Sequence, residues 1–515
     1  MNYEKYLNYL DYETEIEDAY HNLLLEYKIS DNFSDNFSDE HWLYNLPSNI
    51  TQSKGFKIHL SASILNANLV AKKFFDFIFS REKKINFKIL VSIKELSLQN
   101  TGLNGYSQVG KFITIYPKDN KEFQRLLHKL EILYKGVKGV NIPSDFRFQL
   151  SEVVYYRYGE FVKDSTFKDK RDKKIPSNVN VPIRDYYIPR YNTIPDQYII
   201  LEVISKNAKG GVYKVFNTQK RVYSLLKEAS DLSLVDFTNR DSVNRLINER
   251  EILVELEKEE FTPKVFNDFY IKNSYFVEFE FIIADKLSEY NMVSGSYDWF
   301  LTLIDYMEII NSKYNLSYRD LSFNNILIDN RNNIYIIDFE HALRKETQIE
   351  EKKLPLFGTP GFYETNLNLL NNQPEDIMGL VLLLYWSQNL DDFNVFSKMS
   401  FLEAMEYAMN FNSRRLDTLD KSDWLYDIYK KAFNYKYDTF SELNQNHQCE
   451  LVVCSAAISR FYRPGPKAHR NSFLAHHFPE QVLKHLSYFL LFISPVNGST
   501  DSNNVSWSAT LSSCN

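Results

Sequence analysis

Cysteine is nearly absent from this 515-residue sequence, and its scarcity limits the chemistry open to most of the chain. The three cysteines are Cys449, Cys454 and Cys514, so the first 448 residues contain none. A framework of disulfide bonds and a zinc site with thiolate ligands are therefore excluded in that part. The spacing of Cys449 and Cys454 matches no familiar metal-binding motif, so we predict no metal site there.

Long apolar runs and an excess of positive charge are also missing. The apolar run 486–496 is too short to span a bilayer, and the acidic, polar start MNYEKYLNYLDYETE is not a signal peptide. The formal net charge is -7, which argues against nucleic acid as a partner. We expect a cytoplasmic protein without a membrane span.

The chain is rich enough in apolar residues, 44% of the total, to build more than one hydrophobic core. Its length predicts two or three domains. Composition changes along the chain suggest where they begin and end. The expected parts are a lead-in (1–50), an α+β domain (51–162), a charged linker with four prolines (163–195), a second domain (196–445) and an atypical tail (446–515).

The first domain shows both types of periodicity. Alternating or β-branched residues predict strands at 57–64, 87–93 and 112–117. Apolar residues at helical spacing predict helices over 67–82 and 123–136. Strands and helices together give the fold class α+β.

The segment SYRDLSFNNILIDNRNNIYIIDFEHA (317–342) is the most informative in the chain. Asp320 and Asn325 lie on an expected loop, and Asp338 follows an apolar strand. Transfer of a phosphoryl group needs a carboxylate to orient the attacking hydroxyl and oxygen ligands for magnesium. At the spacing typical of protein kinases, Asp320 is the candidate catalytic carboxylate, and Asn325 and Asp338 are the candidate metal ligands.

A glycine-containing turn, KGGVYKV (209–215), precedes this segment. Taken alone, Gly210 and Gly211 are more typical of a plain hairpin turn than of a phosphate-binding loop. The following strand ends at Lys227, and an amphipathic helix carries Glu249, 22 residues later. A lysine on the strand after a glycine-rich turn, paired with a helix glutamate, is the nucleotide-binding arrangement of protein kinases. We therefore predict that all four residues contribute to the nucleotide site.

The segments GTPGFYE (358–364) and EDIMGLVLLLYW (375–386) resemble the end of a protein-kinase activation segment and the buried helix after it, with Asp376 anchoring the catalytic loop. This predicts a bilobal protein-kinase-like domain acting on a peptide hydroxyl. Two residues depart from the usual pattern: Tyr318 replaces a histidine, and Glu340 replaces the glycine after Asp-Phe. The second change removes a flexible hinge.

Basic residues recur along the first domain. Lys57 and His59 alternate on one strand and so share a face, and Lys88 lies on the next strand. By periodicity alone, a solvated basic face is the simpler interpretation. The alternative is a site for a phosphorylated side chain, where arginines bind phosphate, a lysine removes a proton and a histidine protonates the leaving group.

The ordered set GFKIHLSA, FKILVS, GKFITIYP, SDFRF and VYYRYGEF, followed by IRDYYIP and the kinase segments, resembles class III or IV lanthipeptide synthetases over about residues 50–390. That resemblance implies an N-terminal domain similar to phosphothreonine lyases. It implies Lys88 as general base and His59 as general acid. The implied phosphate-binding residues are Lys57, Arg147 and Arg157, with Tyr116 and Lys111 as neighbours.

The resemblance also implies ATP or GTP and Mg²⁺ as cofactors, and a precursor peptide containing Ser, Thr and Cys as substrate. Phosphorylation and elimination would leave dehydroamino acids in that peptide. No cyclase is recognisable in 446–515, so a separate cyclase is the expected partner. Two alternatives remain: a small-molecule kinase of the choline or aminoglycoside type, and a pseudokinase that binds peptide without turnover. The sequence predicts no oligomeric state.

Overall fold

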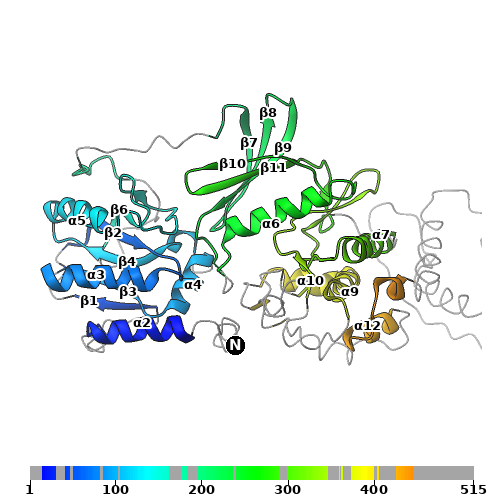
Figure 1. The fold of residues 1–515 in the computed structure, drawn as a ribbon, viewed down its shortest axis with the longest axis horizontal. Helices are drawn as coiled ribbons and strands as arrows, with labels where there is room; N and C mark the ends of the chain where they lie inside the picture. Colours follow the sequence, from blue (N-terminus) through cyan, green and yellow to red (C-terminus); the bar gives the residue numbers. More distant parts are fainter. Residues whose placement is uncertain are drawn as a thin grey trace, which may run out of the picture. The chain divides into compact units, whose positions relative to one another are not determined.

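The computed structural model combines helices with antiparallel sheets (Figure 1). Among the residues it describes, no helix is long and apolar enough to cross a membrane. The described residues are 14–29, 41–46, 50, 52–81, 85–102, 105–161, 175–183, 194–235, 239–289, 298–345, 359, 361–363, 373–399, 403–404, 407 and 425–444. Residues 30–40 and the tail 446–515 lie outside them.

The first domain is built on a six-stranded sheet in which every neighbouring pair is antiparallel. The strand order is β1-β3-β4-β2-β6-β5. The strands are β1 (Trp42–Asn45), β2 (Lys54–Ser61), β3 (Asn86–Leu90), β4 (Lys111–Tyr116), β5 (Phe146–Arg147) and β6 (Val154–Glu160). Three of them, β2, β3 and β4, fall where the sequence pattern predicted strands.

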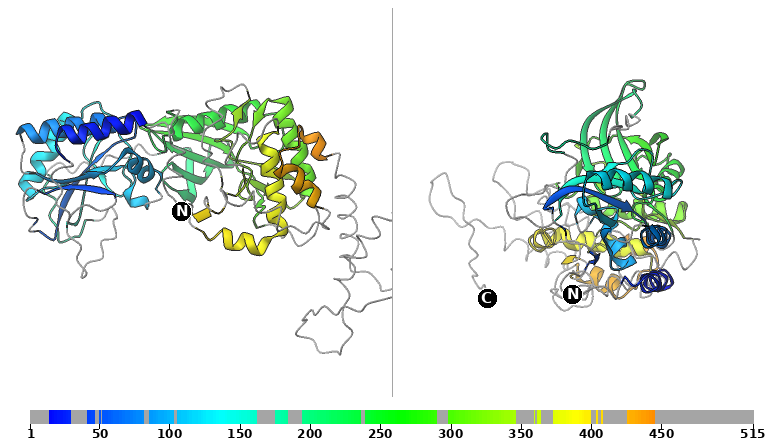
Figure 2. Two further views of the ribbon diagram at one scale, coloured as in Figure 1. Left: turned by 90° about the horizontal axis from the view of Figure 1, so that it is seen from below. Right: turned by 90° about the vertical axis from the view of Figure 1, so that its left-hand side faces the viewer.

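Helices cover one face of this sheet. They are α2 (Thr14–Glu26), α3 (Ala67–Arg81) and α5 (Asn120–Leu133), and the shorter α4 (Ile93–Thr101) follows β3. Phe74 of α3 meets Phe87 of β3 edge to face at 5.1 Å, and Phe123 of α5 stacks on Phe56 of β2 at 4.9 Å between ring centroids. Figure 2 shows α2 and α3, in blue, on one side of the strands. Since side chains alternate along a strand, Lys57 and Lys88 point to the other face.

The first domain uses residues that the sequence analysis assigned to a lead-in segment. Strand β1 forms the edge of the sheet, pairing with β3. Tyr20, Leu23 and Leu24 of α2 are buried in the same core as the strands. The sheet and its core therefore extend in front of residue 51, because the amphipathic α2 needs an apolar partner that only this domain supplies.

The second domain begins with a five-stranded antiparallel sheet of order β10-β11-β9-β8-β7. Helix α6 (Ser242–Glu255) packs against β9, β10 and β11 and starts with a capping box at Asp241. The strands are β7 (Tyr198–Lys206), β8 (Gly210–Asn217), β9 (Val222–Ser230), β10 (Val265–Ile271) and β11 (Ser274–Glu280).

The rest of the second domain is mainly helical. Helix α9 is its centre, with nearly every residue buried because the segment is apolar on all sides. The helices are α7 (Asp298–Glu308), the π-helical turn Ile309–Lys313, α9 (Glu375–Gln388), α10 (Leu390–Phe396) and α12 (Tyr426–Phe433). The short strands are β12 (Asp285–Lys286), β13 (Leu316–Ser317), β14 (Ile326–Ile328), β15 (Ile334–Ile336) and β16 (Leu343–Arg344).

Candidate active sites

A short hairpin brings the two candidate metal ligands of the second domain to the same end. Strands β14 and β15 pair with Ile326 opposite Ile336. Asn325 precedes the first of these residues and Asp338 follows the second, and the Ile337 N–H donates to the Asn325 carbonyl at 3.0 Å. The register of the hairpin therefore places an amide and a carboxylate side by side.

Asp320 is held next to this pair by three donors. Asn325 donates its side-chain N–H to Asp320 Oδ2 at 2.8 Å, and Thr359 donates its N–H and hydroxyl to Oδ1 at 2.9 and 3.1 Å. Burial raises the pKa of Asp320 to about 6, with the neighbouring His341 acting against that rise. A carboxylate with a raised pKa is better suited to accept a proton at neutral pH than an ordinary aspartate.

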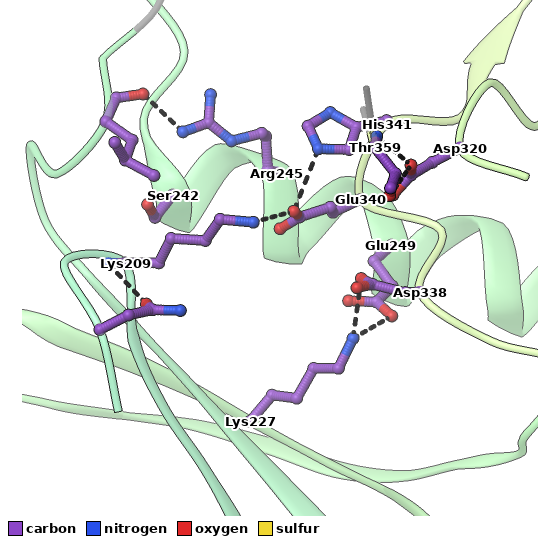
Figure 3. A network of polar contacts seen from close by, with 12 residues as sticks. Lys209, Lys227, Ser242, Arg245, Glu249, Asp320, Asp338, Glu340, His341 and Thr359 are labelled. Carbon is purple, nitrogen blue, oxygen red and sulfur yellow. Dashed lines mark hydrogen bonds and ion pairs between the residues drawn. The ribbon is translucent and has the colours of Figure 1, made fainter. Parts of the chain in front are cut away.

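Lys227 connects the sheet to α6 and to the hairpin (Figure 3). Its Nζ lies 2.6 Å from Glu249 Oε1 and 3.0 Å from Asp338 Oδ1. Although burial alone would lower it, the carboxylates of Asp338 and Glu249 raise the pKa of Lys227 well above its usual value. The sequence analysis predicted the pairing of Lys227 with Glu249, and the structure also brings Asp338 to the same ammonium.

The glycine turn between β7 and β8 is pressed against β9. Gly210 has φ of +155°, and a Cβ atom there would lie 1.9 Å from the Glu228 carbonyl oxygen. A Cβ atom on Gly211 would lie 2.3 Å from the Tyr213 hydroxyl. Only glycine fits at position 210 without a backbone shift, since the obstacle is main chain.

Asp376 anchors the candidate catalytic loop from the start of α9, which is the contact that the sequence analysis predicted. It accepts the N–H groups of Tyr318 and Arg319, each at 2.7 Å. Arg319 and Asp338 both adopt left-handed backbone conformations, with φ of +71° and +66°. Such conformations are uncommon outside glycine and persist where surrounding contacts fix them, which is frequent at active sites. The Tyr318 hydroxyl donates to the Ile337 carbonyl and so links this loop to the hairpin.

Part of the GTPGFYE segment lies within the described residues and contacts the same loop. Thr359 binds Asp320, and the Gly361 carbonyl accepts the indole N–H of Trp386 on α9 at 3.0 Å. Phe362 meets Phe323 edge to face at 5.4 Å. These contacts fix the segment beside the side chain that would receive the substrate's proton.

The first domain carries its candidate site on the sheet face opposite the helices. One row of paired residues crosses all six strands, and a second row lies beside it. The first row is Tyr44, Lys88, Thr114, His59, Tyr155 and Arg147, and the second includes Asn86 paired with Tyr116 and Lys57 paired with Arg157. The Lys57 Nζ lies 5.6 Å from the Tyr116 ring centroid, which brings the two pairs of the second row together.

His59 belongs to a buried network that the sequence analysis did not include. Its Nδ1 is hydrogen bonded to Asp145 Oδ2, and the other Asp145 oxygen lies 3.2 Å from Lys111 Nζ. Burial lowers the pKa of His59 to about 3, with Asp145 opposing, so the ring is neutral at physiological pH. Burial disfavours the charged form of Asp145, but His59 and Lys111 outweigh it and hold its pKa well below its ordinary value. The carboxylate fixes the ring with Nδ1 protonated and Nε2 as the lone-pair nitrogen.

Lys88 lies against aromatic rings of the edge strand. Its Nζ is 3.9 Å from the Trp42 ring centroid and 5.5 Å from that of Tyr44. A cation–π contact favours the ammonium form and fixes its position. Trp42 is therefore a further residue that the sequence analysis missed, because the four-residue strand WLYN is too short to show a pattern.

Arg147 and Arg157 differ in their surroundings. Arg157 is 5% exposed and pairs with Lys57 across β6 and β2. Arg147 lies at the end of the first row, where its guanidinium donates to the carbonyls of Leu150 and Ser151. The structure thus places Arg157 among the other basic residues, while Arg147 is engaged by its own turn.

Comparison with known proteins gives three similarities. A family model described as "RamC, N-terminal domain" matches residues 26–182. The "Probable SapB synthase" of Streptomyces coelicolor is 25% identical over 351 residues, which is 60% of this chain and 37% of that protein. The "cAMP-dependent protein kinase catalytic subunit" of Dictyostelium discoideum is 26% identical over 167 residues, 32% of this chain and 24% of that protein.

The chain therefore spans well under half the length of either relative. The RamC match begins at residue 26, the last residue of α2, and includes all six strands of the first sheet. Together, the family match and the synthase similarity support a relation to the lanthipeptide-synthetase-like proteins.

Proposed function

We propose that this chain modifies Ser and Thr residues of a precursor peptide in two steps: phosphorylation from a nucleotide by a bilobal, protein-kinase-like second domain, then elimination of the phosphate by the first domain. The similarities to a SapB synthase and to a protein kinase support a peptide-modifying enzyme with a kinase-like part. The class III or IV assignment of the enzyme remains part of this proposal.

In the phosphorylation step, Asp320 accepts the proton of the peptide hydroxyl as the hydroxyl oxygen attacks the terminal phosphorus. The bond between that phosphorus and the bridging oxygen breaks, and the nucleoside diphosphate leaves. Lys227, held by Glu249, would contact the inner phosphates, and the backbone of the glycine turn would cover them. Whether the nucleotide is ATP or GTP is part of the test below.

Magnesium fits the residues that the hairpin brings together. Among the described residues no cluster of three or more His, Cys, Asp or Glu side chains is arranged to hold a metal. Magnesium at nucleotide sites takes one or two carboxylates and completes its shell with phosphates and water. Asp338 and Asn325 would hold it. When bound, the ion would neutralise charge on the phosphates.

In the elimination step, a lysine removes the α-proton of the phosphorylated residue, the Cβ–O bond breaks, and the phosphate leaves. The product is dehydroalanine from Ser or dehydrobutyrine from Thr. Lys57 and Arg157 would bind the phosphate, with Tyr116 and Lys111 beside them. His59 would deliver a proton to the leaving oxygen from Nε2, after the arriving phosphate has raised its proton affinity.

We propose that Lys88 is the base. Because Lys57 is another lysine on this face, the Lys57→Met variant is compared with Lys88→Met. The Lys88 Nζ lies over the Trp42 ring, so Lys88 must leave this contact before it can reach the α-proton. A Lys88→Met variant should accumulate phosphopeptide while still phosphorylating. If Lys88→Met eliminates normally and Lys57→Met does not, the two roles are exchanged.

The observation that carries the proposal is the convergence of Asp320, Asn325, Asp338 and Lys227 on one hairpin end. The test is transfer of radiolabelled phosphate from ATP or GTP to a Ser/Thr/Cys-containing peptide encoded beside the gene. Asp338→Ala should abolish transfer, whereas Asp329→Ala, in the exposed turn of the same hairpin, should not. Transfer retained by Asp338→Ala would contradict the assignment.

Mass spectrometry separates this proposal from its two alternatives. A peptide that loses the mass of one water for each modified Ser or Thr has no place in a small-molecule kinase. A pseudokinase scaffold would bind nucleotide and peptide and leave both masses unchanged.

A further inference from the structure

Lys209 is a charged residue of the nucleotide region that neither the sequence motifs nor the proposed mechanism uses. It occupies the tip of the turn between β7 and β8, directly before Gly210. Its Nζ forms an ion pair with Glu340 Oε1 (Figure 3). Glu340 is the residue that stands where protein kinases usually have glycine. Two unusual residues, far apart in sequence, are thus partners.

The backbone of Lys209 is fixed by the surrounding sheet. Its N–H donates to the Asn207 side chain at 3.0 Å, and its carbonyl accepts the Ser230 N–H at 2.8 Å. The contact of Gly210 with the Glu228 carbonyl presses the turn against β9. Only the side chain is therefore free to change partners, and a lysine side chain is a point charge on a flexible stem with three donors.

Glu340 is held in place as firmly as Lys209. Its side chain is 14% exposed, and Oε1 also lies 3.1 Å from His341 Nε2. Asn248 of α6 donates to the Ala342 carbonyl at 2.9 Å and fixes the segment after it. Lys227 of β9 and Lys209 of the turn thus each reach an acid of the same short segment, Asp338 and Glu340 respectively (Figure 3).

We propose that Lys209 is a binding residue for the outer phosphates of the nucleotide, and that Glu340 competes with those phosphates for its ammonium. This assignment rests on the proposed use of a nucleotide. The glycine turn covers the phosphates in kinases, so a lysine at its tip lies over them. When nucleotide enters, the phosphate oxygens replace Glu340 as partner, or share the ammonium with it.

The competition makes opposite predictions for the two partners. Glu340→Gln removes a negative charge from the phosphate position and releases Lys209, so the dissociation constant for ATP should fall about fivefold. Lys209→Met removes an ammonium that binds phosphate and leaves the Glu340 carboxylate near the phosphates, so that constant should rise about tenfold or more. In a Lys209→Met background, Glu340→Gln should improve ATP binding less than it does in the wild type, because that improvement depends on Lys209.

The experiment is calorimetric titration of the full chain with ATP and Mg²⁺, ADP and Mg²⁺, and adenosine. The effect of Lys209→Met should be large for ATP, smaller for ADP and absent for adenosine, which a merely structural role would not produce. Lys214→Met is the matched control, because Lys214 lies on the same β8 strand with its Nζ 4.4 Å from the Phe281 ring centroid. Thermal unfolding checks that each variant is folded.

The outcomes separate this inference from the function on which it rests. A wild-type chain that binds none of these three ligands and neither GTP nor GDP would overturn the proposed function and this assignment together. If ATP binds but Glu340→Gln weakens it or leaves it unchanged, the competition is wrong and the kinase proposal stands. Equal effects of Glu340→Gln with and without Lys209 would likewise overturn the assignment.

Discussion

The two candidate sites have opposite charge and opposite construction. In the first domain, lysines, an arginine and a histidine share a sheet face with one buried carboxylate, Asp145, among them. In the second domain, four acids meet two lysines at the ends of elements far apart in the chain. A site rich in cations is suited to hold a phosphate directly, whereas a site rich in acids must reach phosphates through a metal ion and its lysines.

The elements that position each site determine which properties a substitution there should change. The first site is positioned by the register of paired strands, so its members are fixed as soon as the sheet forms. The second depends on loops, a turn and residues in left-handed conformations, which are held only by tertiary contacts. Substitutions in the first site should therefore change chemistry and stability together, and those in the second should change nucleotide binding most.

Asp145→Asn should have the largest effect. The amide no longer fixes the His59 tautomer, and Lys111 is left beside a neutral group. Elimination from a phosphoserine peptide should slow on the order of 10²-fold, and the free energy of unfolding should drop by about 3 kcal/mol. The rate of phosphate elimination is measured on a preformed phosphopeptide, and the free energy of unfolding is measured by denaturant titration. Phosphorylation should be unchanged; a parallel loss would show that the two sites are not separable.

Acid should weaken the first domain before the second. The pKa of His59 is lowered from 6.5 to about 3 on folding, so the unfolded chain takes up the proton first. The His59 contribution to stability is complete above pH 6.5 and decreases as pH falls toward 3, by about 1.4 kcal/mol per unit. Amide hydrogen exchange in β2 and β4 between pH 7 and 5 measures this loss of stability.

His59→Gln should flatten this dependence, because it removes the group that titrates. His128→Gln is the control, since His128 is exposed on α5. If the free energy of opening of β2, obtained from its exchange rates, falls equally in the wild type and in His59→Gln as the pH falls, the acid sensitivity has another source.

Gly210→Ala should give the smallest of the three effects. The added Cβ must push the Glu228 carbonyl away, which should destabilise the turn by about 2 kcal/mol and weaken ATP binding. Gly136→Ala is the comparison, because Gly136 also has a positive φ of +77° but no atom within 4 Å of the added Cβ. It should cost only the backbone strain, about 1 kcal/mol. Similar nucleotide affinities in the two variants would argue against a phosphate-covering role for the turn.

Local patterns predicted those parts of the sites that depend on local structure. Alternation along β2 correctly put Lys57 and His59 on one face, and spacing typical of protein kinases grouped Asn325 with Asp338. The partners across the fold were not predictable. Asp145 is 86 residues from His59 and precedes a two-residue strand with almost no periodic signal. The pairing of Lys209 with Glu340 spans 131 residues and depends on how the sheet meets the hairpin.

The lead-in segment shows a different reason for a missed contact. Strand β1 has only four residues, too few for a pattern to separate a strand from a loop. Its place at the sheet edge depends on pairing with β3, where Lys88 lies over the Trp42 ring. The tail and residues 184–189 of IRDYYIP fall outside the described residues, and the expectations for them stay predictions.

The row of residues that crosses six strands has a consequence for how this domain can vary in length. Deleting one residue inside β2 would turn Ile58 and Leu60 toward the polar side and bury His59 under the helices. Insertions and deletions should therefore be tolerated between strands and rejected within them. A library of single-codon deletions across residues 52–161, sorted for folded protein, should show gaps that coincide with β2, β3, β4 and β6.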